Sequence, residues 1–143
     1  RPMGEKMTNL SDELLAKFRE ICSGIRDLEI SYSPEIEFSY DKLLNFLLAN
    51  TADRGILSRE IVATVGEYKN VRRTGDVLLS VDALAYCMHL LRWPEVLAAA
   101  EKEHTLHFSQ KADSTLIPLI DSFRDDWEES VDYRRFAHNG VRN

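Results

Sequence analysis

The sequence has few cysteines and no long apolar run, and each shortage excludes a class of protein. Only two cysteines occur, Cys22 and Cys87, so a scaffold held together by disulfides is excluded. Each lies within an apolar helical pattern, and we expect two buried free thiols. No stretch approaches the ~18 consecutive apolar residues of a membrane span, and no charged-then-apolar leader is visible. We therefore expect an intracellular domain, in the cytoplasm or nucleus, with no membrane partner.

Positive charge is also in short supply. The chain has 18 Lys and Arg residues against 24 Asp and Glu residues, a formal net charge of -6. An acidic chain repels phosphate backbones unless its basic residues are gathered on one surface. Nucleic acid is therefore a disfavoured partner.

The apolar residues that are present recur with helical spacing. The 143 residues suffice for one core, and the first seam runs through Leu14, Phe18, Ile21, Ile25 and Leu28. Further helices are predicted over about 39–50 with Ser39 as cap, 58–70 with Ser58 as cap, 74–91 with its start at Thr74 or Asp76, 94–103 and 114–139. Residues 30–38 break the period, and we expect an ordered loop that packs Ile36 and Phe38 on the core. The prediction is an all-α fold of about six helices, in a single bundle or a short α-solenoid-like stack of helical hairpins.

The domain boundaries follow from the same pattern. Residues 1–8 lack periodicity and are expected to form a flexible leader or tag remnant, with N-cap residues at Asn9 to Ser11. Residues 9–139 form the single helical domain, and residues 140–143 form a tail after Gly140, a plausible helix stop. Because the chain starts with Arg1 and not with Met, we expect a fragment of a larger protein, a processed form or a chain with a tag remnant.

An acidic run near the end is the best single candidate for a binding site. On a continuous helix over 114–139, Asp121, Asp125, Glu128 and Asp132 fall on one face, next to an apolar stripe. Like charges at this spacing destabilise a helix by a few tenths of a kcal/mol per pair. A solvated surface explains such a face, and so does a docking surface for a basic protein segment.

The end of the chain carries the main alternative hypothesis. Arg134 and His138 are separated by three residues and would share the stripe of the final helix. This pair resembles the arginine–histidine signature of the HEPN superfamily, helical bundles that include ribonucleases, although the spacing in that family is longer. The resemblance implies acid–base work for His138 and phosphate binding for Arg134. The other interpretation is a structural arginine paired with a carboxylate.

Two further patterns lead to no site. Glu101 and His104 have a Glu-x-x-His spacing, with His107 next to them, but no third ligand or second motif accompanies them. Ser58 to Arg73 resembles a helix-turn-helix, but its apolar register is displaced by one residue. We expect no metal and no cofactor.

The hypothesis favoured by the sequence is a helical protein–protein interaction domain, an adaptor or scaffold, that docks a basic segment on its acidic face. No catalytic motif accompanies the helical pattern, so an enzyme is the less favoured class. The alternative is a HEPN-like RNA-processing enzyme, or a nucleic-acid-binding domain, that uses Arg134 and His138. A protein partner is expected, and homodimerisation through the seam of the first helix is a second option.

Overall fold

The computed structural model describes residues 2–68, 77–106 and 115–141, with side chains over residues 10–68, 77–106 and 115–137. Over these residues every regular element is helical and no strand is present. The α-helices are α1 (Pro2–Ile30), α2 (Ile36–Ala49), α3 (Arg54–Glu67), α4 (Val81–Leu91), α5 (Pro94–Leu106), α6 (Ile117–Asp121) and α7 (Arg134–Val141). Two 3-10 helices accompany them, η1 (Thr51–Asp53) and η4 (Glu128–Asp132). The predicted all-α class is confirmed.

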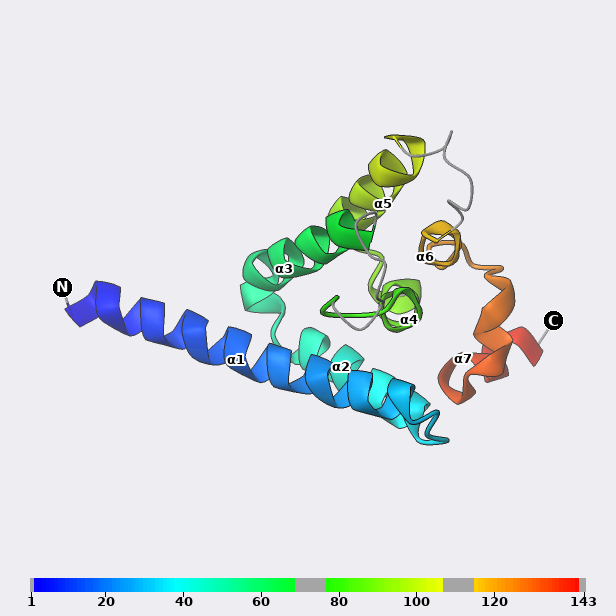
Figure 1. The fold of residues 1–143 in the computed structure, drawn as a ribbon, viewed down its shortest axis with the longest axis horizontal. Coiled ribbons are helices and arrows are strands. Elements are labelled where there is room, and N and C mark those ends of the chain that lie inside the picture. The colour runs from blue at the N-terminus through cyan, green and yellow to red at the C-terminus, as the bar shows by residue number, and fades with distance from the viewer. Residues whose placement is uncertain (1, 69–76, 107–114, 142–143) are drawn as a thin grey trace.

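The helices form a bundle around α4 (Figure 1). Helix α1 packs along α2, α3 packs along α5, and α4 lies between α2 and α6. Three of these four pairings, α3 with α5, α2 with α4 and α4 with α6, join helices that are not consecutive, whereas a stack of hairpins would pair each helix with the next. Of the two predicted arrangements, the bundle is the one observed. Among the described helices, none is both long and apolar enough to cross a bilayer.

Helix α1 is longer than the sequence pattern indicated. It begins at Pro2, where the missing N–H of proline is tolerated, and residues 2–8 belong to the helix. Its seam is buried at Phe18, Ile21 and Ile25 against the rest of the chain. Because the domain itself covers these residues, this part of the seam is not available to a second copy.

Two helix starts differ from the predicted caps because the serines have other partners. Helix α2 begins at Ile36, and Ser39 donates a hydrogen bond to the Ile36 carbonyl from inside the helix. Phe38 is consequently 76% exposed, and the expectation that it packs on the core is wrong. Helix α3 begins at Arg54, and its Ser58 donates to Glu95 at 2.7 Å.

Helix α4 has the clearest local signal of the bundle. Ser80 has extended backbone and accepts a hydrogen bond from the Ala83 N–H at 3.1 Å, a serine N-cap. The helix therefore starts later than the predicted Thr74 or Asp76, which lie outside the described residues. Helix α5 starts at Pro94, as predicted.

The core agrees with the helical periodicity. Seven apolar residues on the seams of the predicted helices would form the core, and six of them are buried: Phe18, Ile21, Leu47, Leu84, Met88 and Trp127. The seventh, Phe123, is half-buried and packs against the core from its edge. Both cysteines are buried free thiols, as predicted.

Candidate functional site

The C-terminal segment, residues 115–137, is not the single long helix that the sequence predicted. Helix α6 ends at Asp121, and the chain continues through turns into η4 and α7. His89 on α4 anchors the chain at this point, because its Nδ1 lies 2.8 Å from the Ser122 carbonyl oxygen. This contact ties the end of α6 to α4, and the neighbouring carboxylates would repel one another if one helix continued through them.

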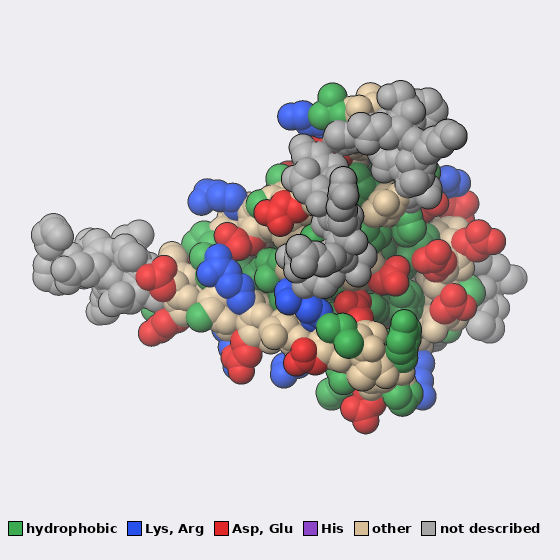
Figure 2. Space-filling model, in the orientation of Figure 1, with side chains coloured by type: hydrophobic (Ala, Val, Ile, Leu, Met, Phe, Trp, Pro, Cys, Tyr) green, Lys and Arg blue, Asp and Glu red, His purple; other side chains and the backbone are tan. Residues whose placement is uncertain are grey.

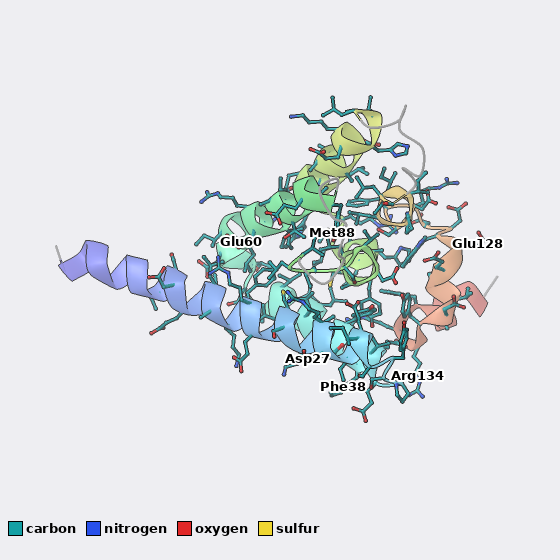
Figure 3. All side chains as sticks on the ribbon, in the orientation of Figure 1. Asp27, Phe38, Glu60, Met88, Glu128 and Arg134 are labelled. Carbon is teal, nitrogen blue, oxygen red and sulfur yellow. The ribbon has the colours of Figure 1, made fainter. Side chains whose placement is uncertain are left out.

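This break separates the four carboxylates that were predicted to share one helix face. Asp121 is the last residue of α6, and Asp132 lies in η4. Asp125 is in the intervening turn, and its Oδ1 pairs with Nη1 of Arg92 at 2.9 Å. Glu128 begins η4 at the outer edge of the segment (Figure 3). The four carboxylates lie in one region of the surface, but the prediction that they share one face of a continuous helix is wrong.

Carboxylates do gather around Glu129, which the sequence analysis did not single out. Its pKa is raised, first by partial desolvation and then by the charges of four other carboxylates. These belong to Asp82, Asp132, Asp121 and Glu128. Asp82 comes from the first turn of α4, and no sequence pattern connects it to residues 121–132. Figure 2 shows acidic side chains gathered over α6 and the C-terminal segment.

Next to these carboxylates, α4 and the C-terminal segment enclose a groove of about 970 Å³, which we name the α4 groove. Its apolar lining comes from Leu90, Trp127, Val131 and Phe136. Its charged lining comes from Arg92, Asp125, Asp126 and Glu128, and His89 and Ser130 complete it. Leu90 is 46% exposed and Val131 is 54% exposed, so the groove leaves apolar surface uncovered beside its charged lining residues, which we call its border.

The inner wall of the groove is held by aromatic packing. The His89 ring lies 5.1 Å from the Trp127 ring and 4.8 Å from the Phe136 ring. Tyr133 packs edge-on against Tyr86, with ring centroids 5.0 Å apart. Such contacts are specific in geometry and bury large areas, so they fix the non-helical path of the segment.

Helix α7, which supplies Phe136 to the groove, is held to α2 at Asp41, a residue outside the groove lining. Asp41 Oδ1 accepts from the Tyr86 hydroxyl at 2.8 Å and from Arg135 Nη1 at 2.6 Å. Burial and the hydrogen bond to Asp41 raise the pKa of Tyr86, so this hydroxyl stays protonated and donating. The groove is therefore a preformed feature of the fold, with walls from α4, η4 and α7.

The structure describes only one of the two side chains of the alternative site at Arg134 and His138. Both residues lie in α7, and the Arg134 side chain is exposed beside Phe38 on α2 (Figure 3). The side chain of His138 lies outside the described side chains, so the arginine–histidine pair stays a prediction. The neighbouring Arg135 pairs with the carboxylate of Asp41.

The structure also describes only part of the Glu-x-x-His pattern and of the helix-turn-helix pattern. Glu101 is exposed on α5 while His104 is half-buried there, and His107 lies outside the described residues. Over the residues that the structure describes, no group of three or more His, Cys, Asp or Glu side chains is arranged to hold a metal. In the helix-turn-helix pattern, Arg72 and Arg73 likewise lie outside the described residues.

A second hollow, of about 700 Å³, was not indicated by the sequence. It lies between the end of α1 and residues 77–82. Glu29 Oε2 accepts there from the Tyr40 hydroxyl at 2.7 Å and from Ser80 Oγ at 2.5 Å. These bonds join α1, α2 and the cap of α4, so Glu29 has a structural role that only the folded chain reveals.

Comparison with known proteins adds no constraint. No family model matches the chain, and neither a curated protein nor a solved structure matches it. The function is therefore argued from the α4 groove.

Proposed function

We propose that the chain is a protein–protein interaction domain that docks a basic, amphipathic segment of a partner protein in the α4 groove. The observation that carries this proposal is the combination of uncovered apolar side chains with an acidic border in one preformed groove. An adaptor or scaffold role in an intracellular protein fits this activity. The two buried free thiols fit the reducing conditions of the cytoplasm or nucleus.

The border of the groove favours a positively charged occupant. Three carboxylates and one guanidinium line it, so its formal charge is negative. The chain as a whole carries -6, and its field attracts basic partners over the same distances at which it repels phosphates. A basic protein segment is therefore favoured over nucleic acid.

The floor of the groove supplies the apolar part of the affinity. Leu90 and Val131 are about half exposed, while Trp127 is 4% exposed and gives the floor a rigid base. Apolar contacts in the centre with charges around them are the usual anatomy of a protein interface. The occupant should therefore alternate basic and apolar side chains, as an amphipathic segment does.

The test is association with a synthetic peptide of about twelve residues that alternates arginine and leucine, measured by fluorescence anisotropy. We expect the double variant Asp125→Lys/Glu128→Lys to weaken binding by more than about tenfold, with a melting temperature close to that of the parent. Binding by the parent should also weaken as salt rises above about 0.15 M.

A matched control separates the groove from net charge. Glu13 and Glu20 are exposed on α1, so Glu13→Lys/Glu20→Lys makes the same change in net charge on a different helix. This control should bind nearly as well as the parent. If both double variants lose the same affinity, the groove has no part in binding. A third variant, Leu90→Ala/Val131→Ala, should also weaken binding, because it removes the apolar floor and leaves the charges.

A further inference from the structure

We propose that the segment docked in the α4 groove presents an arginine to Asp125, and that Arg92 occupies this position as an intramolecular competitor when the groove is empty. This inference rests on the proposed function. It adds the kind of basic residue recognised and names a residue of the chain that opposes binding.

The backbone of Arg92 is the first observation. Arg92 is the C-cap of α4 and has φ 51° and ψ 45°, in the left-handed region. Its N–H donates to the Met88 carbonyl at 2.9 Å, which ends the helix. Glycine or asparagine usually fills such a position, because other side chains are strained there. An arginine thus stands where the local backbone favours a different residue.

The contacts of its guanidinium are the second observation. Nε donates to the His89 carbonyl at 3.0 Å, and Nη1 pairs with Asp125 Oδ1 at 2.9 Å. Both contacts lie at the groove, and both hold the side chain across the acidic border. Arg92 therefore shows, within the chain itself, how a guanidinium sits on this wall.

The border as a whole is matched to arginine. Asp126 is paired with Arg124, whose Nε and Nη2 lie 3.2 and 3.4 Å from the two carboxylate oxygens. Two of the three border carboxylates are thus paired with guanidinium groups of the same chain. A guanidinium offers several N–H groups in a planar fork, whereas the lysine ammonium is a point charge. The same carboxylates should therefore prefer an incoming arginine to a lysine.

The pair between Arg92 and Asp125 is suited to exchange. The side chain of Asp125 is 95% exposed and that of Arg92 is 35% exposed. A solvated ion pair of this kind contributes little, so an incoming guanidinium can replace it without opening the core. A partner arginine on Asp125 would release Arg92 into solvent.

The experiment compares two peptides and three variants. The arginine–leucine peptide is compared with its lysine–leucine counterpart on the parent, and on Arg92→Asn, Asp125→Asn and the double variant Arg92→Asn/Asp125→Asn. Asparagine suits position 92 because it tolerates the left-handed region, so the melting temperature of Arg92→Asn should equal or exceed that of the parent.

We expect the parent to bind the arginine peptide more tightly than the lysine peptide. Arg92→Asn should raise the affinity for the arginine peptide by roughly twofold to fivefold, the range that loss of a surface ion pair allows. In the Asp125→Asn background the same substitution should have no effect, because the contested carboxylate is absent. A gain that persists in that background would mean that Arg92 acts only through its charge, and would overturn the inference.

The remaining outcomes separate this inference from the proposed function. If neither peptide binds the parent or Arg92→Asn, both proposals fail. If the parent binds through the groove but Arg92→Asn binds no better, or if arginine and lysine peptides bind equally, the proposed function stands and the inference fails.

Discussion

The carboxylate of Glu37 on α2 caps the first turn of α7 by accepting hydrogen bonds from the backbone N–H of Arg134 at 2.9 Å and of Arg135 at 3.0 Å. The first N–H groups of a helix have no partner within the helix, and a carboxylate there also meets the positive end of the helix dipole. Glu37 therefore ties the last helix to the second and holds one wall of the α4 groove.

Loss of this cap should destabilise the C-terminal segment first. We expect Glu37→Ala to lower the free energy of unfolding by about 1 kcal/mol, the usual effect of losing a helix cap. Hydrogen exchange at the amides of α7 should quicken more than exchange in α4. Glu35→Ala is the control, because no side-chain cap hydrogen bond is made by Glu35 at the N-cap of α2. Equal effects of the two substitutions would contradict the capping role.

The centre of the bundle should respond most strongly to the removal of apolar volume. Leu84 on α4 is fully buried, so Leu84→Ala should lower the free energy of unfolding by about 2–5 kcal/mol, as large-to-small core changes do. Leu48→Ala, at a site on α2 that is 39% exposed, should have a much smaller effect. Denaturant unfolding measures both, and a loss below about 1 kcal/mol for Leu84→Ala would place α4 outside the core.

The carboxylates around Glu129 should make stability depend on pH. The folded chain raises the pKa of Glu129 through partial desolvation and the neighbouring negative charges, so it binds this proton more tightly than the unfolded chain does. The tighter proton binding stabilises the folded chain. This stabilisation is fully present below the ordinary pKa of a glutamate and is lost as pH rises through the raised pKa of Glu129. At neutral pH the ionised group opposes folding.

Glu129→Gln should therefore raise the melting temperature at pH 7, by an amount corresponding to no more than roughly 0.5 kcal/mol for an exposed group. The gain should shrink as pH falls through the raised pKa. Glu20→Gln on α1 makes the same change at an exposed site of another helix and serves as the control. A gain for Glu129→Gln that does not change with pH would contradict the assigned cause.

The two thiols should be unreactive in the folded chain. Burial raises the pKa of Cys22 to about 12, and it also raises the pKa of Cys87. At pH 8 both are protonated, and the thiolate is the form that reacts. A disulfide reagent should modify neither residue in buffer and both in about 6 M guanidinium. The exposed site of Ser31→Cys should react at once, and comparable labelling of Cys22 or Cys87 in buffer would contradict the buried placement.

The sequence by itself determined the all-α class, most of the core and the positions of several helices. Phe18, Ile21, Leu84 and Met88 are buried as their spacing predicts, because helical periodicity depends only on local geometry and on which face is apolar. The starts of helices were less predictable. A serine that can cap a helix can equally bond within one, as Ser39 does.

Only the tertiary structure decided the path of the C-terminal segment and hence the candidate site. Local periodicity favoured one long helix. Instead, the Nδ1 of His89 contacts the Ser122 carbonyl, Glu37 caps α7, and the Trp127 ring packs against the His89 ring. These contacts join residues 33 and 97 positions apart, and no local pattern reports them. The sequence located the acidic residues, whereas their arrangement around an apolar groove follows from long-range contacts that compete with local helix formation and prevail.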